Sequence, residues 1–267
     1  MAIEMVGLGV IAAYLGKDGL AKLLGPTADY LGGELKDFAQ RRIENVGKIF
    51  ANASEKVPHE KQNVGAVPPK VLRSILNEGS YSSECIGIEY FGGILASSKS
   101  EINRDDRASR LTQKISSLST YQLRAHYLLY SSLVAQFKGS GLTLNYDRNK
   151  LMMFVTMRSF LHCMDFNRDE FKQIDSIFLH TFSGLEQEGL ISKDYAYGSE
   201  GFAKGMYPQI KGNGIIFEPT ASGADLLLWA FGAGNKECNY IFDIGFSSDI
   251  KGIDIAKLEF RPVSEIK

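Results

Sequence analysis

The sequence predicts a mostly α-helical protein with a small β component. Apolar residues recur at helical spacing over more than a hundred residues after Pro26, and prolines, glycines and capping residues divide this region into segments. Strand-like patterns are confined to the last hundred residues. The 267 residues, 44% hydrophobic and 23% charged, are typical of one large or two small domains. We expect a helical domain over 1–166 and a second domain over 167–267.

The first segment, residues 2–24, is apolar but does not fit a signal peptide, because Glu4 stands where such peptides carry positive charge. Residues 2–15 are also shorter than the roughly 20 apolar residues that span a bilayer. Together with Lys17 and Lys22 the segment predicts an amphipathic helix. Such a helix packs on the core or on a partner, which we favour, or lies in a membrane interface.

Two helices are expected next. The first follows Gly25-Pro26, with Thr27 or Asp29 as its cap. Its apolar stripe comprises Leu31, Leu35, Phe38, Val46, Ile49 and Ala53. The second begins at Pro68-Pro69 and ends at Gly79. Its inward-facing residues are Val71, Leu72, Ile75 and Leu76.

A glycine-containing helix is predicted to begin at Ser82 or Ser83, and its small residues permit close helix contacts. The charged connection that follows contains Asp105, Asp106 and Arg107. The two carboxylates could bind a divalent cation, but no third oxygen ligand stands at a useful spacing. We therefore expect them to cap the next helix or to pair with Arg104 or Arg107. The apolar face of that helix comprises Ala108, Leu111, Ile115 and Leu118.

The helix at 118–133, "LSTYQLRAHYLLYSSL", combines a capping box, Ser119 with Gln122, and several polar groups on an apolar background. Arg124 shares one face with Tyr127, whereas His126 lies on another. The two groups are therefore expected to pair separately with neighbouring helices. An anion or nucleotide pocket around Arg124 and Tyr121 is the alternative.

The remaining sequence predicts a helix over 150–164, in which His162 is expected to be packed. A helix ending at Gly189 is followed by a short strand, a glycine-rich excursion over 195–216 and an apolar helix with Trp229. This order is typical of a winged-helix module. Segments 239–246 and 253–260 predict terminal strands.

The charge distribution argues against duplex DNA as a partner. Residues 168–267 hold ten Lys and Arg against fifteen Asp and Glu, and the predicted recognition helix is acidic. Phosphate binding requires cations, so we read the module as a protein-interaction domain and expect a protein partner or self-association.

No catalytic motif stands in the chain. There is no HExxH, GxSxG, Walker A or GxGxxG sequence. The three cysteines, Cys85, Cys163 and Cys238, are widely spaced and predict apolar fillers in a reducing cytoplasm rather than a zinc site. We expect no metal and no cofactor.

Four groups of residues together resemble the bacterial abortive-infection alpha (Abi-alpha) family. In order along the chain they are Gly25-Pro26, Val67-Pro68-Pro69, Tyr90-Phe91-Gly92-Gly93 and Arg124-x-His126-Tyr127. The resemblance covers residues 20–230 and is most specific in the first half. It implies a role in phage defence, in which an infected cell stops growing or dies before progeny are released, and it supplies no catalytic residues to carry over to this chain.

These observations predict a cytoplasmic phage-defence protein that acts by binding a protein or a ligand rather than by catalysis. The candidate binding residues are Tyr121, Arg124, His126, Tyr127, Asp105, Asp106 and Arg107. Two other classes remain. One is a membrane-perturbing effector that uses residues 2–24, and the other is an enzyme that uses the Arg124/His126 helix.

Overall fold

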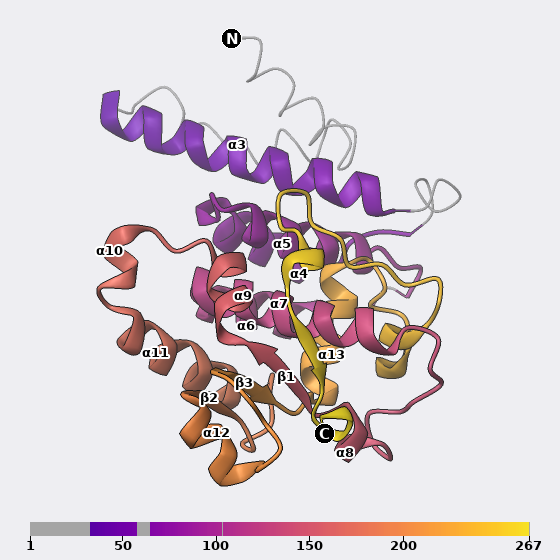
Figure 1. Cartoon of the computed structure of the whole chain (residues 1–267). Coiled ribbons are helices and arrows are strands. Elements are labelled where there is room, and N and C mark those ends of the chain that lie inside the picture. The colour runs from indigo at the N-terminus through magenta and orange to yellow at the C-terminus, as the bar shows by residue number, and fades with distance from the viewer. Residues whose placement is uncertain (1–32, 58–64, 103, 267) are drawn as a thin grey trace. The chain divides into compact units, whose positions relative to one another are not determined.

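The computed structural model describes residues 33–57, 65–102 and 104–266, and the side chains of residues 33–39 and 206 are not among those described. Its helices accompany one four-stranded antiparallel sheet (Figure 1). The described residues form two compact units. The helical unit contains residues up to Ser117 together with Trp229–Asn235, and the sheet unit contains Leu118–Leu228 and Lys236–Lys267.

The helical unit is built on α3 (Gly33–Lys56), which lies along α5 (Cys85–Ser97). The described part of the predicted α3 stripe is confirmed, because Val46, Ile49 and Ala53 are buried. Leu31 and the whole predicted helix at 2–24 lie outside the described residues, and the side chains of Leu35 and Phe38 are not among those described.

Two shorter helices complete this unit. Helix α4 (Pro69–Glu78) begins with a proline, whose fixed φ suits a first helical turn, and is followed by the short 3₁₀ helix η3 (Gly79–Tyr81). Helix α6 (Ala108–Ser117) packs on α4. The buried residues of these two helices include Val71, Ile75, Ala108, Leu111 and Ile115, as the spacing predicts.

Helix α5 approaches the segment Trp229–Asn235 closely. A Cβ at Gly93 would overlap the backbone of Ala230, and the Ser97 hydroxyl donates to the carbonyl of Trp229 at 3.1 Å. The small residues predicted to permit close contact do so here. The contact brings a segment from late in the chain into the core of the helical unit.

The sheet unit begins with α7 (Thr120–Phe137), whose predicted capping box is confirmed. Helix α8 (Arg148–Leu151) leads into β1 (Met153–Thr156). Helices α9 (Met157–Met164), α10 (Arg168–Phe171) and α11 (Ile174–Gln187) follow. The rest of the unit comprises β2 (Ala196–Gly198), α12 (Glu200–Met206), β3 (Gly214–Phe217), the first part of α13 (Ala221–Ala230) and β4 (Phe260–Pro262).

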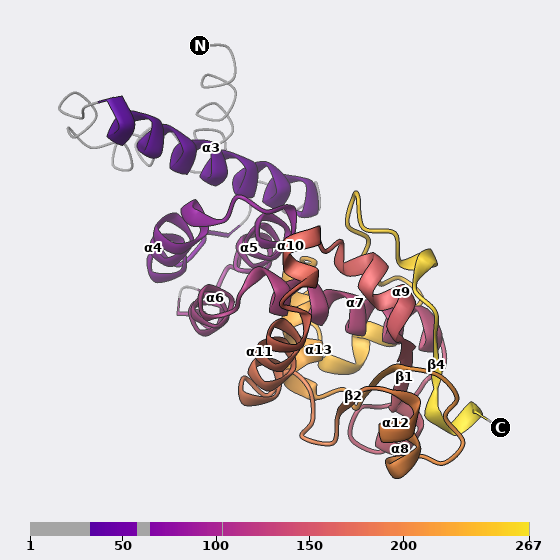
Figure 2. The same cartoon turned by 60° about the vertical axis from the view of Figure 1, so that its left-hand side comes forward.

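The strands are ordered β2-β3-β1-β4, with β1 antiparallel to both β3 and β4. Helices α9, α10 and α11 lie between β1 and β2 in sequence (Figure 2). The predicted fold class, mostly α with a small β component, is therefore confirmed.

The predicted helix over 150–164 is wrong in its first half, where β1 stands. Phe154 and Val155 pair with Ile216 and Ile215 on one side and with residues of β4 on the other. A phenylalanine, a valine and a threonine in succession suit a strand once two partners are present, and those partners override the helical spacing.

The predicted terminal strands also differ from the structure. Segment 239–246 overlaps the 3₁₀ helix η4 (Cys238–Phe242), in which the consecutive residues Ile241 and Phe242 are both buried. A strand would place them on opposite faces. Segment 253–260 contains a second 3₁₀ turn, η5 (Ile255–Lys257), before the short strand β4.

The compact units divide the chain after Ser117, whereas the sequence places a domain boundary at residue 166. The reason is β1, which is hydrogen-bonded to β3 and so joins α7–α9 to the sheet unit. In the described part of the chain, none of the helices combines the length and the hydropathy needed to cross a bilayer.

The Gly93 contact generates a test of the helical unit. We expect Gly93→Ala to lower the free energy of unfolding by about 1–3 kcal/mol or more, because the new methyl group overlaps backbone rather than a movable side chain. The measurement is urea denaturation followed by circular dichroism. Gly205→Ala in α12 is the control, because apart from its own helix backbone and chain neighbours no heavy atom lies within 4 Å of a Cβ at this position. Equal effects of the two substitutions would contradict the predicted close packing.

Candidate functional site

The two groups singled out on α7 bind separate neighbours. Arg124 Nε donates to the carbonyl of Cys163 at 2.8 Å, at the carboxyl-terminal end of α9. His126 has no exposed surface, stacks on Tyr130 with ring centroids 4.6 Å apart, and lies with Nε2 3.0 Å from the carbonyl oxygen of Gly223. A carbonyl only accepts, so Nε2 carries the proton. Arg124 and His126 therefore do not share a site.

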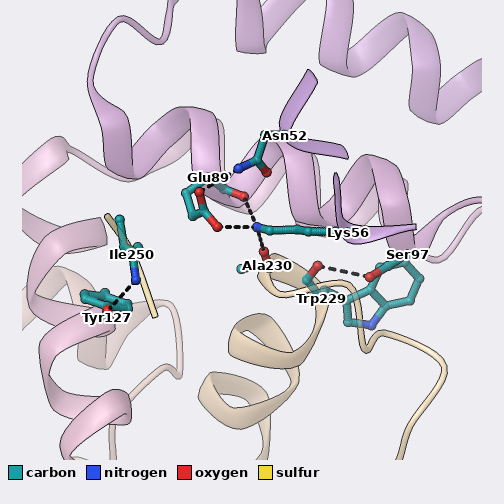
Figure 3. Close-up of polar contacts among 8 residues, drawn as sticks. All are labelled: Asn52, Lys56, Glu89, Ser97, Tyr127, Trp229, Ala230 and Ile250. Atoms are coloured by element: carbon teal, nitrogen blue, oxygen red, sulfur yellow. Dashed lines mark hydrogen bonds and ion pairs between the residues drawn. The ribbon is translucent and has the colours of Figure 1, made fainter. Parts of the chain in front are cut away.

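The two candidate tyrosines of α7 are also engaged in the fold. The Tyr127 hydroxyl accepts from the backbone N–H of Ile250 at 3.1 Å (Figure 3). Tyr121 donates to Glu170 Oε1 at 2.6 Å, and this hydrogen bond to the carboxylate raises the pKa of Tyr121 and lowers the pKa of Glu170. Glu170 also belongs to the capping box of α10 with Asn167. Both tyrosines thus connect α7 to later segments of the same unit.

Tyr130 is the residue of this helix that the sequence reasoning missed. Its buried hydroxyl donates to the carbonyl of Leu190 at 2.6 Å and accepts from the N–H of Thr220 at 2.8 Å. Burial raises the pKa of Tyr130, so the hydroxyl keeps its proton at neutral pH. The available signal was its position four residues after His126, on the same helix face.

The acidic pair before α6 forms surface ion pairs. Arg107 donates twice to Asp105, at 2.8 and 2.9 Å, and these bonds lower the pKa of Asp105. Asp106 pairs with Lys70 at 3.0 Å. Two roles were expected for this acidic pair. Pairing with Arg107 is observed for Asp105, whereas neither the Asp105 nor the Asp106 carboxylate accepts a hydrogen bond from the start of α6. Among the described residues no group of three His, Cys, Asp or Glu side chains could hold a metal ion.

A largely buried charged cluster lies in the helical unit, and its charged groups are paired with one another. Lys56 pairs with Glu89 at 2.5 Å and donates to the carbonyl of Ala230 at 2.7 Å (Figure 3). Asn52 donates to the same carboxylate at 2.6 Å. Burial lowers the pKa of Lys56 although Glu89 opposes this effect. The Lys56 and Glu89 side chains are 14% and 13% exposed, which leaves little room for a ligand, and their partners are internal.

The sheet unit, in contrast, has an open groove that a ligand can enter. It has a volume of about 1120 Å³ and is bounded by three segments: 156–166 with α9, the turn 211–213 before β3, and 257–259 before β4. Phe171 of α10 adds to its edge. The groove is large enough for a small organic ligand, whose sites are usually 300–1,000 Å³.

The charged side chains around this groove are exposed. The cations are Arg158, Lys211 and Lys257, and the carboxylates are Asp165 and Glu259. The side chains of Arg158 and His162 make no hydrogen bond or ion pair with any described residue. His162 was predicted to be packed, which is wrong. Its neighbour Cys163 faces the core, and the helix turns about 100° per residue, so His162 points outward.

The hydroxyl groups of the groove are already used. Ser159 Oγ lies 2.8 Å from Thr156 Oγ1 and accepts from the N–H of Glu259 at 3.0 Å. Thr156 Oγ1 donates to Glu259 Oε2 at 3.0 Å. Among the described groove residues no hydroxyl or thiol is hydrogen-bonded to a histidine, as an activated nucleophile requires.

The cysteines are only partly as expected. Cys163 is buried, and burial raises the pKa of its thiol, as suits an apolar filler. Cys238 is half-buried. Cys85 is exposed at the first turn of α5, so the filler interpretation is wrong for this residue.

Comparisons of this chain with protein-family models, with curated proteins and with solved structures found no match. The chemistry assigned to the groove therefore rests on its own residues.

Substitution of two arginines of the sheet unit tests which side chains stabilise the fold and which are free to bind a ligand. We expect Arg124→Ala to lower the free energy of unfolding by about 1–3 kcal/mol, because the Cys163 carbonyl loses its donor. Arg158→Ala should change it by less than about 0.5 kcal/mol, because Arg158 is exposed and bonds no described residue. Chemical denaturation measures both. A destabilising Arg158→Ala together with a neutral Arg124→Ala would reverse the assignment.

Proposed function

We propose that this chain is a phage-defence protein that acts by binding, and that the groove beside α9 is its ligand site. One observation carries the assignment of the site. Arg124 and His126 of α7 are hydrogen-bonded within the fold. The cations that line the groove are exposed, and among them the Arg158 side chain has no ion pair with a described residue. Lys257 has only a distant ion pair, 3.9 Å to Asp254.

The defence role rests on the resemblance to the Abi-alpha family. Two of its most specific groups, Tyr90-Phe91-Gly92-Gly93 and His126-Tyr127, are buried. Pro68-Pro69 stands at the start of α4. Such positions preserve a fold and its packing, and they supply no reaction. This is the reason for proposing a binding protein rather than an enzyme that uses the Arg124/His126 helix.

A protein partner or self-association and a cytoplasmic location belong to the same proposal. The exposed surface of α11 supports a protein contact, because Leu179 is 60% exposed and Asp175 is also exposed. The same acidic helix argues against duplex DNA, whose phosphates it would repel. The membrane alternative depends on residues 2–24, which lie outside the described residues, and it remains the second candidate.

Phage challenge of a bacterial host that expresses the chain tests the proposal. We expect the intact chain to reduce plaque formation. The triple variant Arg158→Ala/Lys211→Ala/Lys257→Ala should lose protection while keeping its melting temperature, because these side chains are exposed and do not hold the core. The matched control removes the same charge elsewhere, with Lys48→Ala/Arg110→Ala/Lys193→Ala, and should still protect.

Full protection by the groove variant would show that the groove is not the defence site. Absence of protection by the intact chain against every phage tested would contradict the defence role. Loss of protection in both triple variants would indicate an effect of total charge rather than of the groove.

A further inference from the structure

The groove combines exposed cations with two aromatic rings, of which Phe171 is exposed and Phe166 is half-buried. Phe166 and Phe171 line one end, with ring centroids 6.0 Å apart at an interplanar angle of 80°. Phe171 is 47% exposed, although burial of a phenylalanine is normally favourable. Arg158, Lys211 and Lys257 line the same groove. A ligand that uses both features has an anionic part and a flat apolar part.

The backbone that carries the cations is held in place. The N–H of Met157 donates to the carbonyl of Asn213 at 2.9 Å, which ties the start of α9 to the turn that contains Lys211. The N–H of Thr156 donates to the carbonyl of Glu259 at 2.9 Å, which ties it to the segment of Lys257. The N–H of Gly212 donates to Glu200 Oε2 at 2.8 Å. Cations on fixed backbone bind with less loss of entropy than cations on free loops.

The carboxylates of the groove restrict the ligand further. Asp165 and Glu259 stand beside the three cations, so a ligand carrying only negative charge would meet repulsion as well as attraction. Carboxylates accept hydrogen bonds from hydroxyl and amino groups. A ligand that offers anionic oxygens, hydroxyl or amino donors and an aromatic face satisfies all three kinds of groove residue.

We propose that the groove binds a nucleoside phosphate, with the phosphate at Arg158, Lys211 and Lys257 and the base against Phe171 and Phe166. This inference rests on the proposed function only in using the same groove. Exposed aromatic side chains stack on unpaired bases, and arginine and lysine bind phosphate oxygens. The base must be free, so the ligand is a mononucleotide or an unpaired strand end, and not a duplex.

Calorimetric titration of the purified full-length chain tests this assignment. The probes are ATP, AMP, adenosine, inorganic phosphate, a single-stranded oligodeoxyadenylate and polyglutamate. We expect the nucleotides to bind more tightly than adenosine or phosphate alone, because only they use both ends of the groove. Tighter binding of the oligonucleotide than of AMP would identify a strand as the source of the nucleotide, and the reverse would identify a free nucleotide.

Two variants distinguish a nucleotide site from a simple anion site. Arg158→Ala and Phe171→Ala should each weaken nucleotide binding by roughly ten- to a hundredfold, because each removes one of the two contacts. The controls are Arg110→Ala and Phe202→Ala, whose side chains are exposed and do not line the groove, so that these substitutions should have no effect. Melting temperatures verify that all four variants are folded.

The inference is overturned if Phe171→Ala binds nucleotide as well as the intact chain, if phosphate binds as tightly as ATP, or if only polyglutamate binds. Absence of nucleotide binding together with loss of phage protection in the groove variant would remove this inference and leave the proposed function. Nucleotide binding by a chain that gives no phage protection would support this inference and contradict the proposed function.

Discussion

One largely buried ammonium group, that of Lys56, connects three parts of the helical unit that are far apart in sequence. It pairs with Glu89 of α5 and donates to the carbonyl of Ala230, where α13 ends. Ser97 donates to the neighbouring carbonyl of Trp229 and accepts from the N–H of Gly234 at 3.2 Å. A buried ion pair that loses one partner costs about 3–5 kcal/mol. The segment 229–235 is thereby part of the helical unit, although it follows the sheet strands in sequence.

The sheet unit depends in a comparable way on the polar groups of α7. His126, Tyr127 and Tyr130 donate to or accept from backbone groups of segments that come much later in the chain. Buried polar groups must find partners, so these side chains fix where the later segments lie. The groove is a consequence of this order. Its cations come from three segments, 156–162, 211–213 and 257–259, that the sheet and its hydrogen bonds bring together.

Local signals made part of the fold predictable. The capping box of Ser119 and Gln122, the proline start of α4 and the apolar stripe of α6 each depend on residues within a few positions of one another. Strand β1 was missed because its character depends on pairing with β3 and β4. The sequence also placed Arg124 and His126 on separate faces, which the hydrogen bonds bear out. It gave no sign of the groove, because Arg158, Lys211 and Lys257 share no motif and meet only in the folded chain.

Lys56 holds the segment 229–235 in the helical unit. The chain's single tryptophan, Trp229, belongs to this segment, so its fluorescence reports directly on whether the segment stays in place. Trp229 is 3% exposed and Arg107 lies over its ring. The measurement is quenching of tryptophan fluorescence by acrylamide in Lys56→Ala. Lys138→Ala is the control, because Lys138 likewise donates to a carbonyl, that of Phe246, but in the sheet unit. We predict weak quenching in the intact chain and in the control and strong quenching in Lys56→Ala. Equally weak quenching in all three proteins would contradict the claim.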